Sequence, residues 1–283
     1  MGLFGNSYAK EGPGVDKNAP QKKRFFLFWD LYFRKFWKLV QVNLLYVIFW
    51  IPAAVGVYYL VFGGLNLVSL LLILLSVVLG GPANAGMTYV LRNFAREEHA
   101  FVFSDFRDKF KENFKQAAIY NVLYTAVMAL IVIAAWFYFR NVPQNKFFYL
   151  PLILSLACFL VVNFMNFYMY TMIVTFRMGL RQMLKNAFIF SVLGIVTNIV
   201  TFLFTGAIVV LMVLFFPLTL LFVALIACST VCFIATFNAY PRIEKYMIAP
   251  QQPHDEDEDE DGEEEERIFS DERLIPEDTD GGQ

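Results

Sequence analysis

The charged side chains of this 283-residue chain are confined to its ends and to short segments between long uncharged blocks. Residues 39–91, 116–139, 147–176 and 186–241 contain no Asp, Glu, Lys or Arg. A helix that crosses the hydrocarbon core of a bilayer needs roughly 20 predominantly apolar residues. The blocks therefore predict two, one, one and two spans, so the expected fold class is an all-α polytopic membrane bundle of six transmembrane helices.

Turn-forming residues divide the two longest blocks. Gly63, Gly64 and Asn66 interrupt the first block, and Pro217 interrupts the last. We predict a membrane domain over residues 25–248, preceded by a polar segment over residues 1–24. Its expected spans lie near residues 40–61, 65–91, 117–139, 148–176, 187–213 and 217–240.

Basic residues predict the orientation of these spans. Lys and Arg are concentrated in residues 1–38, 92–115, 177–185 and 242–245, whereas of the opposite connections only residues 140–146 carry any charge. Cytoplasmic loops of membrane proteins carry an excess of Lys and Arg. The pattern therefore predicts a multi-pass protein with both termini in the cytoplasm.

The C-terminal segment has the opposite charge. Residues 251–283 hold 16 acidic and 2 basic side chains, a net charge of −14, whereas residues 1–250 hold 21 basic and 9 acidic side chains, a net charge of +12. Dense runs of like charge repel one another and stay solvated. We predict an acidic disordered tail over residues 249–283; a plain solvated tail and a docking segment for a basic partner both fit it.

Two segments on the cytoplasmic side have aromatic residues at helical spacing. One covers residues 25–38, and the other covers residues 103–115. Such helices can lie in the headgroup region with their rings buried in lipid, or can dock a partner helix. Both interpretations stay open for the cleaner of the two faces, which consists of Phe103, Phe106, Phe110 and Phe114.

Asparagines recur at similar places in the uncharged blocks and suggest an internal repeat of three helical hairpins. Amides inside a membrane bundle hydrogen-bond between helices, each bond contributing roughly 0.6 kcal/mol. They therefore act as packing contacts, which is the interpretation we favour, or they line a polar vestibule open to the cytoplasm. The candidates are Asn43, Asn121 and Asn198 on the first helices and Asn84, Asn163 (or its neighbour Asn166) and Asn238 on the second.

The predicted spans contain little that resembles reaction chemistry. They have no ionisable group of the kind that marks proton relays or voltage sensors. Neither His99 nor His254 belongs to a metal-ligand spacing, so we expect no catalytic residue, metal or cofactor, no enzyme activity and no nucleic-acid partner. Gly80, Gly81 and Pro82 form the one strong interruption within a span and predict either a hinge or a close helix approach.

Several strings resemble a known family. They are KEGPGV at residues 10–15, Asn43 at the start of the first span, GPANAGMTYVLR at residues 81–92 and NFKQ at residues 113–116. They are similar to the YesL-like family of uncharacterised integral membrane proteins of Gram-positive bacteria, over about residues 1–250. The resemblance implies a bacterial plasma-membrane location and an accessory role beside carbohydrate uptake, and it carries over no catalytic residue.

Two functions follow as expectations. The first is a non-enzymatic accessory or regulatory membrane protein that contacts lipid and a transporter subunit, or another protein, through its cytoplasmic aromatic helices and acidic tail. The alternative is a carrier or channel for a small neutral solute such as a sugar, lined by the asparagines. The sequence does not indicate an oligomeric state.

Overall fold

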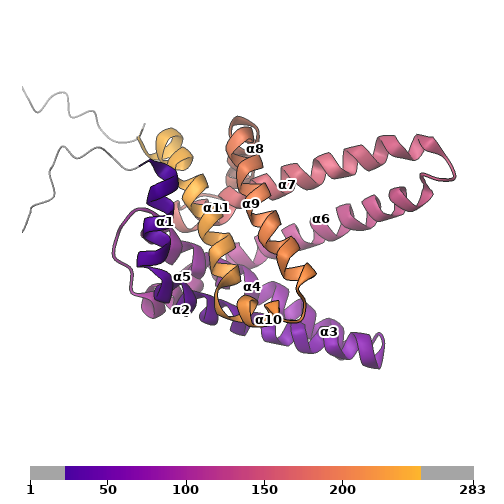
Figure 1. The fold of residues 1–283 in the computed structure, drawn as a ribbon, viewed down its shortest axis with the longest axis horizontal. Coiled ribbons are helices and arrows are strands. Elements are labelled where there is room, and N and C mark those ends of the chain that lie inside the picture. Colours follow the sequence, from indigo (N-terminus) through magenta and orange to yellow (C-terminus); the bar gives the residue numbers. More distant parts are fainter. Residues whose placement is uncertain (1–22, 250–283) are drawn as a thin grey trace, which may run out of the picture. The chain divides into compact units, whose positions relative to one another are not determined.

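The computed structural model describes residues 23–249, and every regular element in that part of the chain is helical (Figure 1). Six segments are long and apolar enough to cross a membrane, which confirms the predicted number of spans. The predicted N-terminal polar segment and acidic tail lie almost entirely outside the described residues. The six segments are Phe36–Gly63, Leu67–Ala95, Phe114–Asn141, Lys146–Thr175, Ile195–Leu214 and Thr219–Ile248.

The chain divides into two compact units, Met1–Pro241 and Arg242–Gln283, and all contacts described below belong to the first. Its first hairpin consists of α2 (Phe36–Val47), the short η2 (Ile48–Trp50), α3 (Ile51–Gly63) and α4 (Leu67–Ala95). Gly64 turns the chain with a φ of 73°, a value that glycine adopts without steric cost. The Asn66 side chain then caps α4 by accepting a hydrogen bond from the Ser69 amide (2.8 Å).

Two further hairpins follow. The second consists of α6 (Phe114–Asn141), η3 (Lys146–Phe148) and α7 (Tyr149–Thr175). The third consists of α9 (Ile195–Leu214), α10 (Thr219–Phe222), the π-helical η4 (Val223–Ala227) and α11 (Cys228–Ile243); the π-helical η5 (Glu244–Ile248) comes after it. The chain turns at Pro217, between α9 and α10, as predicted.

A short helix precedes each hairpin: α1 (Arg24–Arg34), α5 (Val102–Glu112) and α8 (Leu180–Leu193). The residue that joins it to the next helix has nearly the same backbone conformation each time. The φ and ψ angles are −104° and 11° at Lys35, −97° and 9° at Asn113, and −96° and 14° at Gly194. This similarity agrees with the predicted repeat of three hairpins, but the repeat itself stays a prediction.

The fifth span begins later than expected. We predicted one helix over residues 187–213, whereas the structure ends α8 at Leu193 and starts α9 at Ile195. The Asn198 amide donates to the carbonyls of Phe190 (3.2 Å) and Ser191 (3.0 Å) in the last turn of α8. These bonds tie the first turn of α9 to the last turn of α8, where the Phe190 carbonyl also accepts from the Gly194 amide (2.9 Å), and so they stabilise the break.

Helix α4 packs against α2, α3, α5, α6 and α7. Glycines let three of these neighbours approach closely, because a Cβ at each would meet backbone on the adjoining helix. A Cβ on Gly56 would lie 2.9 Å from the carbonyl oxygen of Ser69, and one on Gly86 would lie 2.7 Å from that of Phe106. A Cβ on Gly81 would overlap with the carbonyl of Ala117.

The candidate hinge at Gly80, Gly81 and Pro82 does not interrupt the helix. Helix α4 runs unbroken from Leu67 to Ala95, and all three residues are buried. The structure therefore assigns Gly81 to a close contact with α6, the second of the two roles that the sequence predicted.

Candidate functional site

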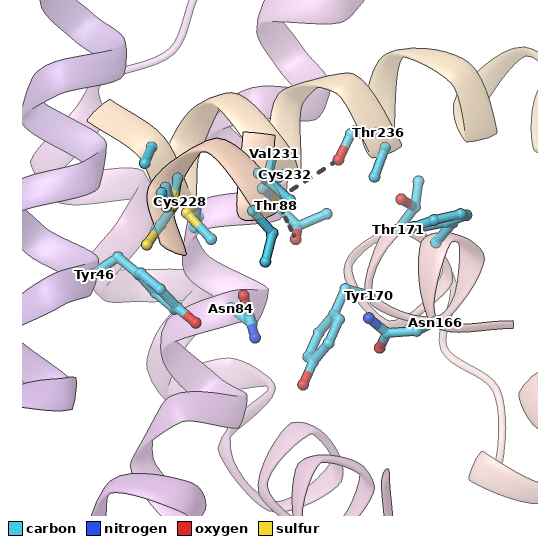
Figure 2. Close-up of a pocket in the computed structure, with 16 residues that line it drawn as sticks. Tyr46, Asn84, Thr88, Asn166, Tyr170, Thr171, Cys228, Val231, Cys232 and Thr236 are labelled. Atoms are coloured by element: carbon cyan, nitrogen blue, oxygen red, sulfur yellow. Dashed lines mark hydrogen bonds between the residues drawn. The ribbon is translucent and has the colours of Figure 1, made fainter. Parts of the chain in front are cut away.

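A cavity of about 300 Å³ lies between α2, α4, α7, α9 and the segment formed by η4 and α11 (Figure 2). This volume is at the lower end of the range for small-molecule sites. No charged side chain lines it, but polar groups reach it from four parts of the chain. The polar lining consists of Tyr46, Asn84, Thr88, Asn166, Tyr170, Thr171, Cys228, Cys232 and Thr236.

One side of the cavity carries two tyrosine hydroxyls and an amide. In Figure 2 the Asn84 side chain of α4 lies between Tyr46 of α2 and Tyr170 of α7, and it is a polar neighbour of both hydroxyls. The Tyr170 hydroxyl donates to Oδ1 of Asn121 (2.7 Å), which fixes its direction. Its oxygen lone pairs remain able to accept a hydrogen bond from a ligand.

Helix α7 adds two groups with unused hydrogen-bonding capacity. The Thr171 hydroxyl is fully buried and has no hydrogen-bond partner among the described residues. The Asn166 side chain makes one hydrogen bond, from the Tyr120 hydroxyl to Oδ1 (2.9 Å), and its other amide terminus can bind a further group. A buried polar group without a partner costs free energy, so the Thr171 hydroxyl favours a polar occupant, and the half-buried Asn166 amide offers it a further hydrogen bond.

Thiols and hydroxyls form the opposite side. The Cys232 thiol lies 3.5 Å from the Thr88 hydroxyl and 3.9 Å from that of Thr236, and Figure 2 shows both contacts. Cys228 is one turn away on the same helix face. Within residues 23–249 no three His, Cys, Asp or Glu side chains gather in an arrangement that could hold a metal ion.

Three of the six predicted asparagines are buried packing contacts outside the cavity. Asn43 donates to the carbonyls of Val223 (2.9 Å) and Ala224 (2.8 Å) and accepts from the Ser229 amide (2.9 Å). Asn121 donates to the carbonyl of Val77 (2.7 Å), and Asn198 accepts from the Tyr168 hydroxyl (2.7 Å). The structure thus supports the packing interpretation for these three residues.

The other three are separated from one another. Asn84 lines the cavity. Asn163 donates to the Phe159 carbonyl of its own helix (2.8 Å), and Asn238 donates to the Thr201 hydroxyl (2.9 Å). Of the six candidates, Asn84 is the one that lines this cavity.

Sequence reasoning did not single out Tyr46, Tyr170, Thr171 or the two cysteines as residues of a site. A signal for the tyrosines was present, because a Tyr inside an uncharged block carries a hydroxyl that needs a partner when it is buried.

The predicted aromatic face, which the structure divides between α5 and the first residue of α6, is only partly exposed. Phe106 is buried, and Phe110 stacks on Phe49 with ring centroids 4.9 Å apart. Phe103 and Phe114 remain exposed. This second pair is the more accessible to lipid or to a partner, since Phe110 is half-buried and Phe106 is buried.

Cations near the ends of α4 and α5 are held by aromatic rings and polar groups. The buried Arg92 guanidinium donates to the Thr175 hydroxyl (2.9 Å) and lies 4.7 Å from the centre of the Tyr89 ring. Lys109 approaches the same ring. Its hydrogen bond to Glu112 lowers the pKa of that exposed carboxyl. These contacts join α4, α5 and α7 beyond the cavity.

No curated protein and no solved structure matches the chain. A family model described as "Protein of unknown function, DUF624" matches residues 39–135, which extend from α2 through most of α6. The matched segment supplies Tyr46, Asn84 and Thr88 to the cavity, whereas the α7, α9 and α11 walls lie beyond it. Over these residues the chain is similar to an uncharacterised protein family.

Proposed function

We propose that the cavity binds a small, uncharged, hydrogen-bonding solute such as a sugar or polyol, and that the protein serves as a carrier or channel for it. The observation that carries the proposal is that Thr171, a residue of the cavity lining, has a buried hydroxyl without a partner among the described residues. The absence of charge from the lining favours a neutral solute, because an ion would enter without a compensating partner.

The lining offers both hydrogen-bond donors and acceptors. Hydroxyls and amides carry both functions, and a sugar hydroxyl likewise both donates and accepts. The walls also contain apolar side chains such as Phe167 and Val231, which can pack against the carbon face of a sugar ring. The lining combines apolar side chains with convergent polar groups, as small-molecule pockets do, although here the polar residues are unusually numerous.

An accessory role beside carbohydrate uptake, which the YesL-like resemblance implies, stays a second proposal. It relies on the cytoplasmic aromatic helices and the acidic tail. On the second of these helices Phe103 and Phe114 are exposed, whereas Phe106 is buried and Phe110 stacks on Phe49. Solute binding is independent of that face. If crosslinking from Phe103 captures a transporter subunit while purified protein binds no neutral solute, the accessory function replaces the one that we favour.

Thr171→Val is expected to weaken solute binding about fivefold while leaving the empty protein as stable or more stable. The variant loses one hydrogen bond to the ligand, about 1 kcal/mol, but removes a buried hydroxyl that lacks a partner. Binding is measured by calorimetry in nanodiscs with a panel of neutral sugars and polyols, and stability by thermal unfolding of the empty protein.

Thr205→Val is the matched control. Thr205 is also buried, but its hydroxyl donates to the Thr201 carbonyl within α9 and does not line the cavity. This variant should bind the solute as the wild type does. Equal binding by the Thr171 and Thr205 variants, or preferential binding of sugar phosphates over neutral sugars, contradicts the proposed site.

We further propose a bacterial plasma-membrane location, which the YesL-like resemblance implies, with both termini in the cytoplasm, on the basis of the basic loops. A reporter enzyme fused after Lys245 should then be active on the cytoplasmic side, and one inserted near Asn145 should be active outside. The two insertions control each other, because the proposed topology requires opposite signals. The proposed topology is contradicted if both reporters are active on the same side of the membrane, or if the reporter after Lys245 is active outside and the one near Asn145 inside.

A further inference from the structure

A second hollow, of about 480 Å³, lies between α1, α9 and α11. Its walls are almost entirely apolar and include Phe28, Trp29, Phe204, Ile208 and Leu211. Several of these side chains are partly open to the surroundings; Trp29 and Phe204 are 42% and 57% exposed. The hollow is therefore an open groove on an apolar surface, separate from the cavity described above.

Contacts between α1 and α11 differ at the two ends of the groove. At one end the Arg24 guanidinium donates to the Phe237 carbonyl (2.9 Å) and lies 5.3 Å from the centre of the Phe237 ring. Phe28 stacks on Phe233, with ring centroids 5.3 Å apart. At the other end the Tyr32 hydroxyl lies 3.0 Å from the Thr230 hydroxyl. Successive turns of α1 thus line a wall about 12 Å long.

Charge is restricted to the Arg24 end. Arg24 is the one charged side chain in the lining, and the neighbouring Lys23 is exposed. At the far end the polar groups are engaged, because the Tyr32 and Thr230 hydroxyls bond to each other and Thr230 donates to the Ile226 carbonyl (2.9 Å). The groove is therefore cationic at one end and apolar along the rest of its length.

We propose that this groove binds an anionic phospholipid, with one acyl chain along α9 and α11 and the phosphate beside Arg24 and Lys23. A phospholipid has the same order of polarity, with an anionic group at one end of a long apolar chain. The basic loops near α1 predict that this end faces the cytoplasmic leaflet, which carries the anionic lipids. The proposal does not depend on the solute cavity.

Native mass spectrometry of the full-length, delipidated protein tests the proposal. Phosphatidylglycerol and phosphatidylcholine with identical acyl chains are titrated separately. The wild type should retain one phosphatidylglycerol at least fivefold more tightly than phosphatidylcholine. Arg24→Gln should remove this preference while keeping a bound lipid, because the apolar groove is unchanged. If Arg24→Gln still prefers phosphatidylglycerol over phosphatidylcholine as the wild type does, the phosphate does not lie beside Arg24 and the proposal is overturned.

Ala207→Trp is designed to fill the groove from the exposed face of α9, and it should reduce lipid retention at least tenfold. Val210→Trp is the matched control, since Val210 is 56% exposed on the same helix but lies outside the groove lining. It should behave as the wild type does. Normal gel-filtration profiles show that both variants are folded.

A photoactivatable group on the acyl chain identifies the binding surface directly. Crosslinks should map to α1, α9 and α11 in the wild type and disappear in Ala207→Trp. Unchanged crosslinking in this variant overturns the proposal. So does a variant that retains lipid but changes its oligomeric state, because the groove is then a contact between two copies of the chain.

Discussion

Asn43→Leu is expected to destabilise the bundle by about 2–5 kcal/mol, because it leaves three backbone groups without their partner. The Asn43 side chain is fully buried and makes three hydrogen bonds to Val223, Ala224 and Ser229. These residues lie in and beside the π-helical segment η4, where the helix departs from the usual pattern of carbonyl pairing. Leucine is similar in size but cannot bond to any of them.

The loss of stability caused by Asn43→Leu should be localised at η4. Hydrogen exchange measured by mass spectrometry should increase over residues 223–229, and thermal unfolding in detergent should begin at a lower temperature. Asn141→Leu is the control, because the Asn141 amide bonds only within its own helix, to the Phe137 carbonyl. That substitution should cost less than about 0.5 kcal/mol. Equal losses for the two variants would show that Asn43 does not hold α2 to η4.

The spans could be predicted because a bilayer imposes one strong rule on composition. A segment without charge and of sufficient length is helical, since its backbone groups must find partners within the segment. Gly64 and Pro217 marked the turns correctly for the same local reasons that apply in soluble proteins. The break at Gly194 was missed, because the Asn198 amide that stabilises it also fits an unbroken helix.

The cavity could not be predicted from the order of residues alone. Tyr46, Asn84, Tyr170 and Cys232 are far apart in the sequence, and only the packing of the hairpins brings them together. The partners of the buried asparagines are mostly backbone carbonyls, which leave no trace in the sequence. Asn43, Asn121 and Asn198 make contacts that position the helices, and most of the residues that line the site are different ones.

Helices α4 and α6 are in close contact at Gly81. We therefore expect Gly81→Leu to disrupt the folded structure more than any other single substitution proposed above. A Cβ on Gly81 would overlap with the carbonyl of Ala117 and would lie 2.9 Å from the Asn121 Cβ. Backbone atoms cannot rotate away, so α6 must move. The movement also strains the hydrogen bonds of Asn121 to the Val77 carbonyl (2.7 Å) and the Tyr170 hydroxyl (2.7 Å).

Overpacking of a core costs about 1–3 kcal/mol, and two weakened hydrogen bonds add about 2 kcal/mol, so we expect Gly81→Leu to lose most of its folded population. Fluorescence-detected gel filtration of detergent extracts measures that loss. Gly206→Leu is the control, because a Cβ on Gly206 meets nothing within 4 Å. It should give a normal monodisperse peak, since leucine favours a helix more than glycine does. A normal peak for both variants would mean that α4 and α6 pack less closely than Gly81 indicates, and the Tyr170 side of the cavity would then have a different shape.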